Sequence, residues 1–437
     1  PHPSSFILHP SSFIPPPSSF MLHLFEKFGI ELEYMVVGNN DFRVRPIVDR
    51  IMIARCGEAV NECEVGACGV SNELAAHVFE LKSPEPTADL EQQEADFAAA
   101  VRLTNEILAP EEAHLLPGPM HPTMLPANES ITWPHEGQQI YSLYDSIFNC
   151  RGHGWFNLQS SHINLPFAGD EEFSRLHCAI ILILPLLPAL SAASPFMEGQ
   201  VTGLLDTRLD VYRRNQLRCP SITGEVIPEA VFSQEEYEDR ILQPMYQEIA
   251  PFDREGILAH EWLNSRGAIA RFERNAIEIR LLDVQECPAA DVAIAQFIIN
   301  TLHDLTAHAL HQLKKWSLSS SARAKKKQLL QVISQGFDAP LILPEVREAF
   351  RLPRSVQTAG DFWKHVFRKP HRRPLPHSFE RTVSYIMEEG NLATRLLRFQ
   401  KAQENPRDFL SLLTRLSECL AENKLFIPAM ALRDPTG

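Results

Sequence analysis

Two glutamates alternate with apolar residues in the stretch Gly29-Ile30-Glu31-Leu32-Glu33-Tyr34-Met35-Val36-Val37. Side chains two residues apart share one face of a β-strand, so Glu31 and Glu33 would lie side by side, opposite an apolar face. Their like charges repel, and burial without cations or hydrogen-bond donors costs free energy. Two interpretations fit this stretch: an edge strand with a solvent-exposed face, or a pair of oxygen ligands for a divalent cation such as Mg²⁺.

Three further candidate metal ligands fall inside other strand-like segments. Together with the first pair they make five candidate ligands in four segments: Glu31 and Glu33 in residues 28–37, Glu80 in 77–84, His162 in 155–167 and Glu278 in 276–283. Carboxylates dominate this set. That composition favours Mg²⁺ or Mn²⁺, because a zinc site more often contains several His and Cys residues. The neighbouring residues on the same faces are apolar, so the sequence favours a metal site over the exposed face of an antiparallel sheet.

Arginines form a second candidate group. They bind carboxylates and phosphates through two parallel hydrogen bonds and keep their charge at any physiological pH. Arg280 shares a strand face with Glu278, so it would reach a phosphate held by a metal ion at that glutamate. Two further groups of arginines are close in sequence: Arg208, Arg213, Arg214 and Arg218, then Arg266, Arg271 and Arg274. A surface role is the simplest interpretation of the first group.

The strands that would carry these residues are separated by helices and loops. The expected elements are a hairpin with loops over residues 38–72, a helix capped by Thr87 and ending near Leu108, an ordered loop system over 110–150, a buried helix kinked by Pro185 and Pro188 over 172–193, and a helix over 289–313. This order is not a regular βαβ alternation, and the Gly-rich motifs GxxxxGK and GxGxxG do not occur in the sequence. The sequence therefore favours an α+β fold with an antiparallel sheet.

The chain has 437 residues and a net charge of −14, which argues against nucleic acid or an anionic membrane as a partner. We expect three regions: a disordered Pro/Ser repeat leader over residues 1–27 with a start at Met21, a catalytic domain over 28–314, and a helical C-terminal region over 315–437 that packs on it. None of the eight cysteines forms a CxxC pair. This pattern predicts reduced thiols in a cytoplasmic protein rather than disulfides or a zinc site.

Several motifs resemble, in order, those of the glutamate–cysteine ligase family, and within it the bacterial carboxylate–amine ligases. The likeness extends over about residues 28–430, and the order of the motifs makes it more specific than any one of them. The motifs are Gly29-Ile30-Glu31-Leu32-Glu33, His77-Val78-Phe79-Glu80-Leu81-Lys82-Ser83-Pro84, Ser161-His162-Ile163-Asn164-Leu165, Ser194-Pro195-Phe196, Ile277-Glu278-Ile279-Arg280-Leu281-Leu282-Asp283 and Gly390-Asn391-Leu392-Ala393-Thr394-Arg395-Leu396-Leu397.

This resemblance implies a glutamine-synthetase-like fold, in which a curved antiparallel sheet forms a funnel around ATP and metal ions. It also implies roles by position. The metal ligands would be Glu31, Glu33, Glu73, Glu80, His162 and Glu278. Arg271, Arg274 and Arg280 would contact ATP, with Arg280 at the transferring phosphate. Arg213 and Arg214, followed by Arg208, would hold the substrate carboxylate, and Asn164 would also bind substrate.

The implied activity is ATP- and Mg²⁺-dependent formation of an amide, through an acyl phosphate, from a carboxylate and an amine. The γ-carboxylate of glutamate and the amine of cysteine are the first candidates. The alternatives are a ligase for a different pair, a guanidino kinase on a related fold, and a catalytically silent protein that binds an amino acid or nucleotide. Ligands on all four strands argue against the silent protein. The partners would be small molecules, and a homo-oligomer is compatible with the sequence.

Overall fold

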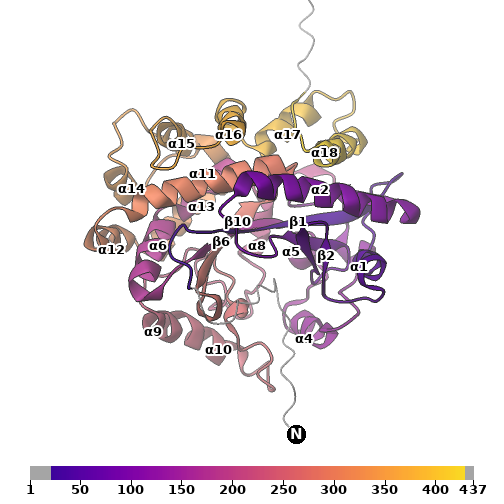
Figure 1. The fold of residues 1–437 in the computed structure, drawn as a ribbon, viewed down its shortest axis with the longest axis horizontal. Helices are drawn as coiled ribbons and strands as arrows, with labels where there is room; N and C mark the ends of the chain where they lie inside the picture. Colours follow the sequence, from indigo (N-terminus) through magenta and orange to yellow (C-terminus); the bar gives the residue numbers. More distant parts are fainter. Residues whose placement is uncertain (1–20, 429–437) are drawn as a thin grey trace, which may run out of the picture.

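The computed structural model describes residues 21–428, and most of the predicted leader over 1–27 lies outside them. An antiparallel sheet forms the centre of the molecule, in the order β2-β3-β4-β1-β6-β10-β9, with β5 paired to the C-terminal half of β1 (Figure 1). The strands are β1 (Gly29–Gly38), β2 (Glu62–Val65), β3 (Cys68–Asn72), β4 (Val78–Lys82), β5 (Ala113–Leu116), β6 (Ser160–Pro166), β9 (Ala268–Arg271) and β10 (Ala276–Asp283), with a separate pair β7 (Phe196–Met197) and β8 (Gln200–Val201).

Helices α2 and α11 lie across one face of the sheet, and α16 and α18 pack against them from outside (Figure 1). Within residues 21–428, no helix has both the length and the apolar character needed to cross a membrane. The helices are α1 (Val48–Cys56), α2 (Leu90–Leu108), α3 (Pro126–Glu129), α4 (Gln138–Phe148), α5 (His153–Phe156), α6 (Gly169–Ile183), α7 (Pro188–Ser191), α8 (Thr207–Tyr212), α9 (Gln234–Tyr237), α10 (Gln243–Ile249), α11 (Pro288–Thr306), α12 (Leu310–Ser319), α13 (Ala322–Gln335), α14 (Pro344–Ala349), α15 (Ala359–Phe367), α16 (His377–Glu389), α17 (Leu392–Lys401) and α18 (Leu410–Glu422).

Strand β1 lies inside the sheet, between β4 and β6, so the interpretation as an edge strand is wrong. Its apolar residues Ile30, Leu32 and Tyr34 are fully buried in the main core, which also contains residues of α2 and α11. Glu31 and Glu33, on the other face, are only 1% and 8% exposed. The predicted α+β class and antiparallel sheet are therefore confirmed, and β1, β4, β6 and β10 fall in the predicted strand segments.

Some segments predicted as loops contain helices. Residues 38–72 form the hairpin β2–β3 but also α1, whose buried Val48, Ile51 and Met52 have the i, i+3, i+4 spacing of an amphipathic helix. Residues 110–150 contain β5, α3 and α4, and α4 buries Ile140, Tyr144 and Ile147. Both helices are short, so the apolar pattern covers few turns and the Gly, Pro and Asn residues nearby dominate the prediction.

Two boundaries near the site also differ from the prediction. Thr87 does not cap α2: the N-cap is Asp89, whose carboxylate accepts a hydrogen bond of 3.0 Å from the backbone of Gln92. The segment that begins at Trp155 first forms the short helix α5, and its strand β6 starts only at Ser160. The apolar pattern of this segment thus marks a buried chain, not a continuous strand.

The two long apolar segments are divided differently from the prediction. The helix expected over 172–193 begins earlier and consists of α6, a 3₁₀ turn (Leu184–Leu186) and α7, because Pro185 and Pro188 interrupt the helical hydrogen bonds. The helix expected over 289–313 is split into α11 and α12. Arg175 donates hydrogen bonds to the carbonyls of Thr306 and His308, so these backbone groups at the C-terminal end of α11 have partners where the helix stops.

The C-terminal region is helical, as predicted, and its side chains continue the core of the sheet domain. Trp363 of α15 packs on Phe297 of α11, with 5.6 Å between the ring centroids, and its indole nitrogen donates a 2.8 Å hydrogen bond to the carbonyl of Leu186. The eight cysteines all carry free thiols. The division at residue 315 into two domains stays a prediction.

Candidate active site

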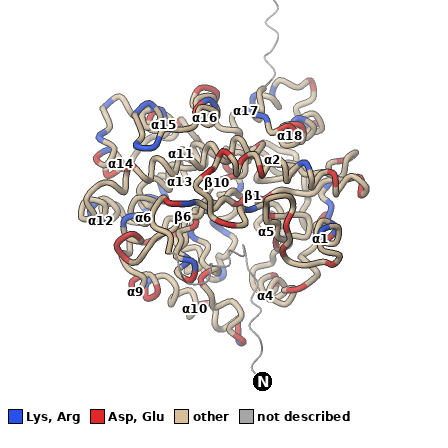
Figure 2. Tube along the Cα trace, viewed as in Figure 1, with Lys and Arg blue, Asp and Glu red and all other residues tan. Residues whose placement is uncertain are grey.

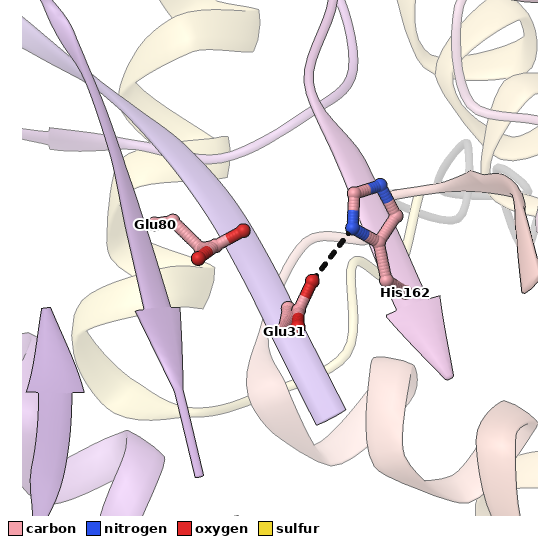
Figure 3. A group of neighbouring side chains, drawn as sticks. All are labelled: Glu31, Glu80 and His162. Atoms are coloured by element: carbon pink, nitrogen blue, oxygen red, sulfur yellow. Dashed lines mark hydrogen bonds and ion pairs between the residues drawn. The ribbon is translucent and has the colours of Figure 1, made fainter. Parts of the chain in front are cut away.

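Strands β1, β4, β6 and β10 bring the predicted acidic residues to one place. Glu33 lies directly opposite Glu80 in the β1–β4 ladder, and Glu31 directly opposite His162 in the β1–β6 ladder. Residues opposite one another in an antiparallel pair project from the same face. Figure 3 shows Glu31, Glu80 and His162 pointing toward one another from three adjacent strands. In Figure 2, charged residues accordingly lie on strands in the middle of the molecule, around β1 and β10.

Residues of β6 hold the two carboxylates of β1. The imidazole of His162 is hydrogen-bonded through Nδ1 to Glu31, at 2.8 Å, and through Nε2 to the hydroxyl of Ser160, at 2.8 Å. The backbone and hydroxyl of Ser160 donate to Glu33 at 2.7 and 3.1 Å. The amide of Asn164 donates to Glu31 at 3.0 Å. Burial would raise the pKa of Glu31, but the hydrogen bond from His162 and its charge lower that pKa to about 2.

Glu73 and Glu80 are in a different electrostatic state. Burial raises the pKa of both carboxyls well above the usual range. The charges of Glu33 and Glu80 raise the pKa of Glu73 further. The charge of Glu31 does the same for the pKa of Glu80. The hydroxyl of Ser71 donates to Glu80 at 3.0 Å. A cation among these groups would favour their ionised forms, since an opposite charge nearby stabilises a carboxylate.

Two groups of side chains have the spacing of a metal site. In each group the ligand atoms lie within 4.8 Å of one another: Glu31, Glu80 and His162 form the first, and Glu33, Glu73 and Glu80 the second. Glu80 belongs to both. A set of carboxylate oxygens with one imidazole nitrogen suits Mg²⁺ or Mn²⁺. Carboxylates placed directly opposite each other destabilise a sheet unless a cation compensates them, so this donor set fits divalent ions.

Arginines border the acidic cluster. Nε of Arg280 lies 2.8 Å from Glu278, and Nη1 of Arg271 lies 3.6 Å from the other oxygen of the same carboxylate. Burial and the charge of Arg271 lower the pKa of Arg274. The charges of Glu278 and Glu31 act in the opposite direction, so Arg274 lies near both carboxylates. A cavity of about 340 Å³ is lined by the six predicted metal ligands together with Arg271, Arg280 and Trp262. The structure thus brings together residues that are far apart in the sequence.

A larger cavity of about 1160 Å³, part of it open to solvent, adjoins this one and shares Glu33, Glu73, His162, Trp262 and Arg280 with it. Arg208 lines the larger cavity and is only 2% exposed. One of its terminal nitrogens, Nη2, donates to the carbonyls of Arg280 and Leu282 at 3.0 and 3.3 Å. The other, Nη1, has no hydrogen-bond partner within residues 21–428.

The other two arginines predicted to hold the substrate carboxylate are placed differently. Arg213 lies 2.7 Å from Asp210, and Arg214 forms an ion pair with the same carboxylate. Neither of them lines the two cavities. The geometry therefore favours Arg208 over Arg213 and Arg214. Asn164, also predicted to bind substrate, donates to Glu31 and so positions a candidate metal ligand.

Sequence reasoning missed the aromatic lining of the larger cavity. Tyr141 and Tyr144 come from α4, Trp155 from α5, Tyr212 from α8, and Trp262 from the 3₁₀ turn η4 (Glu261–Leu263). The available signal was the density of aromatic residues in residues 133–155, which was interpreted only as a loop system. Ser160 was also missed, although it shares a strand face with His162.

Comparisons with known proteins identify the family of the chain. A model of glutamate–cysteine ligase family 2 matches residues 27–407. The chain belongs to this family. The resemblance inferred from the sequence motifs is thereby confirmed.

Individual relatives are more distant. An uncharacterised protein of Archaeoglobus fulgidus is 33% identical over 402 residues, which cover 91% of this chain and 100% of that protein. A Rubrobacter xylanophilus protein with the provisional name glutamate–cysteine ligase 2-3 is 25% identical over 197 residues, 42% of this chain and 47% of its own. The crystal structure of a bifunctional glutathione synthetase from Pasteurella multocida has a TM-score of 0.56 at 14% identity over 91% of this chain, and shows a shared fold. This chain spans only 53% of that synthetase.

Proposed function

We propose that this protein is an ATP-dependent ligase that joins a carboxylate to an amine. The observation that carries the proposal is the convergence of six candidate metal ligands, five of them buried and Glu73 half-buried, and of Arg280 on one cavity. Membership of glutamate–cysteine ligase family 2 supports the same reaction class. In this proposal the sheet is curved into a glutamine-synthetase-like funnel, and all the residues named below come from one copy of the chain.

Two divalent cations, Mg²⁺ or Mn²⁺, would be held by the two ligand groups that share Glu80, with Glu278 beside them. Bound there, such ions compensate the negative charge of the ATP phosphates. Arg280 would stabilise the phosphoryl group in transfer, because its guanidinium is fixed by Glu278 at the border of both cavities. Arg271 and Arg274 would contact the phosphates from the adjacent side of the cluster.

The reaction needs no nucleophile from the protein. An oxygen of the substrate carboxylate attacks the γ-phosphorus of ATP, and ADP leaves. The amine nitrogen then attacks the acyl carbon of the resulting acyl phosphate, inorganic phosphate leaves, and the nitrogen loses a proton. The chain contributes position and charge complementarity, which are the main sources of acceleration in phosphoryl transfer.

Arg208 is the residue that we propose to hold a second carboxylate of the acid substrate, such as the α-carboxylate of glutamate. It lines the larger cavity and has an unpartnered nitrogen, Nη1. Arg213 and Arg214 would serve only if their pairs with Asp210 opened. The γ-carboxylate of glutamate is the first candidate for activation, and the acceptor is cysteine or another primary amine. The free thiols fit a reducing compartment such as the cytoplasm.

Trapping with hydroxylamine tests this proposal, because this small nucleophile converts an acyl phosphate to a hydroxamate without help from the natural amine. The protein should form ADP and hydroxamate in equal amounts with Mg²⁺-ATP and one member of a panel of amino-acid carboxylates. Glu278→Gln should abolish both products, whereas Glu418→Gln, a change in an exposed ion pair on α18, should not. Folded wild-type protein that yields neither product with any carboxylate would exclude the ligase.

A further inference from the structure

The larger cavity has two chemically different ends. One end is the acidic cluster, where Glu33 of β1 and Glu73, which follows β3, line the cavity. The other end is a wall of aromatic rings from α4, α5, α8 and η4, and apolar side chains such as Leu74, Val78 and Leu158 continue it. We call the rings of Tyr141, Tyr144, Trp155, Tyr212 and Trp262 the aromatic wall. The proposed chemistry assigns the acidic end to the phosphates and Arg208 to the acid substrate, which leaves the base of ATP and the acceptor amine as the groups that the wall could receive.

Three rings of the aromatic wall contact one another. The ring centroid of Tyr144 lies 4.9 Å from that of Trp155, in an edge-to-face contact with an interplanar angle of 87°, and 6.5 Å from that of Trp262, in a tilted contact with an angle of 41°. Contacts of this kind hold rings in a fixed arrangement. A surface built in this way is preorganised for a flat apolar group, which it can bind with little loss of conformational entropy.

The tyrosine hydroxyls of the wall are engaged within the protein, whereas the indole nitrogen of Trp262 has no hydrogen-bond partner within residues 21–428. The hydroxyl of Tyr141 accepts a hydrogen bond of 3.1 Å from Asn72, and that of Tyr212 donates at 2.9 Å to the carbonyl of Ser265. Burial raises the pKa of Tyr144, so its phenol stays neutral at physiological pH. The wall therefore presents ring surface to a ligand, not charge.

The positive charges around the larger cavity are few. Of the described residues that line it, only Arg208 and Arg280 carry a fixed positive charge. Arg280 is bound to Glu278 and borders the phosphate end. Nε of Arg208 lies 3.5 Å from Asp283, so the unpartnered Nη1 of Arg208 is what remains for one substrate carboxylate. Two amino-acid substrates would bring two α-carboxylates, and burying the second without a cation would be unfavourable.

We propose that the acceptor of this enzyme is a primary amine with a flat aromatic, or equally bulky apolar, body and no carboxylate. The inference rests on the proposed function and specifies its second substrate. The aromatic body would lie on the wall beside Tyr144 and Trp155, and the amine would point toward the acidic end. Its nitrogen forms the amide bond as the acyl–phosphate bond breaks and phosphate leaves, and the surplus proton leaves with solvent. Cysteine has the extra carboxylate and lacks the flat body.

Competing amines test this inference. With the carboxylate that gives hydroxamate, we would compare phenethylamine, tyramine, ethylamine and cysteine by the rate of amide formation. Transfer of a phenyl group of about 100 Å² from water to an apolar surface predicts a kcat/KM for phenethylamine about 50-fold above that for ethylamine. Phenethylamine should also exceed cysteine, because only cysteine carries an unpaired carboxylate into the cavity.

Substitution in the wall gives a second readout. Trp155→Ala should lower the ratio of phenethylamine to ethylamine by about 10-fold, mainly through KM. Phe367→Ala is the matched control, because this ring packs on Phe297 and lines neither cavity. If Trp155→Ala does not fold, Trp155→Leu keeps most of the apolar volume and should still lower the ratio.

The outcomes separate the two proposals. Hydroxamate formation together with equal or better use of cysteine or ethylamine would overturn the aromatic acceptor and leave the ligase standing. An unchanged amine ratio in both Trp155 variants would also overturn it. Absence of hydroxamate with every carboxylate would overturn the ligase, and the aromatic acceptor with it.

Discussion

The two faces of β1 are buried to a similar extent but in different ways. On one face, Ile30 and Leu32 lie in the main core and need no specific partner. On the other face, Glu31 and Glu33 are almost as inaccessible, yet each is held by hydrogen bonds from β6. The difference shows that burial along this strand does not by itself identify a structural residue. What distinguishes the two faces is the number of donors and opposite charges that each side chain requires.

The acidic face is also the less favourable of the two for stability. Glu33 and Glu80 lie directly opposite each other, and burial with like charges holds the pKa of Glu80 well above its usual range. An apolar pair of similar size would be more stable there, since buried charges seldom stabilise a fold. Perturbed carboxyls gathered in a cavity are typical of functional sites. The two faces should therefore respond in opposite ways to substitution.

Loss of a carboxylate from the acidic face should have the largest effect on activity. Glu80→Gln removes the group that both candidate metal groups share. We expect ATP-dependent hydroxamate formation to fall by about 1,000-fold or more, because a ligand and its charge are lost at the phosphate end. The melting temperature without divalent cations should stay the same or rise. Wild-type activity in this variant would contradict the metal assignment.

Truncation on the apolar face should give the opposite pattern. Leu32→Ala leaves a cavity in the main core and should lower the free energy of unfolding by about 2–5 kcal/mol. Activity per folded molecule should change little, because the acidic face keeps its register with β4 and β6. Urea unfolding and activity at low temperature check the two effects. A large loss of activity without loss of stability would show that the two faces are not separable in this way.

The sequence predicted the acidic face well, because the alternation in β1 and the motifs around Glu80, His162 and Glu278 are local patterns. Residues that depend on the tertiary structure were harder to predict. The order of preference among Arg208, Arg213 and Arg214 was reversed because only Arg208 lines the larger cavity, which the sequence does not specify. The pairs of Arg213 and Arg214 with Asp210, three and four residues before them, are local in sequence. Short helices such as α1 and α4 were missed because two or three turns contain too few apolar positions to show a clear period.

The preference for Arg208 makes a smaller but specific prediction. Arg208→Lys keeps a positive charge but loses the planar fork that binds a carboxylate, so the KM for the acid substrate should rise by about 30-fold. Arg213→Lys should change that KM by less than about 3-fold, because this side chain is engaged with Asp210. Steady-state kinetics with both variants decides between them. Equal effects would restore Arg213 as a substrate-binding candidate.

The smallest effect concerns pH and the buried pair Asp206 and Asp283 behind Arg208. Burial raises the pKa of Asp283 to about 6 and that of Asp206 well above its usual range, where the charge of Asp283 adds to it. A raised pKa means that the folded state binds a proton more tightly than the unfolded chain. The pair therefore contributes stability that is complete below pH 4 and is lost as the pH rises through 6.

Asp206→Asn tests this contribution. Asparagine can still cap α8 as Asp206 does, but it cannot bind the proton that folded Asp206 holds. The loss of stability between pH 4 and 6 should then be smaller than in wild type, by about 1.4 kcal/mol for each pH unit over which only the folded state keeps this proton. Melting curves across this range measure the difference. Parallel curves for the two proteins would rule out proton binding by the pair.

Binding of Mn²⁺ tests most directly whether the acidic face of β1 is a metal site. Bound Mn²⁺ loses its sharp solution signal in electron paramagnetic resonance, so a titration measures the ion itself without any assumption about substrates. We predict saturable binding by wild type and by Glu418→Gln, strongly weakened in Glu80→Gln. Equal Mn²⁺ binding by wild type and Glu80→Gln, with both proteins folded, would contradict the account.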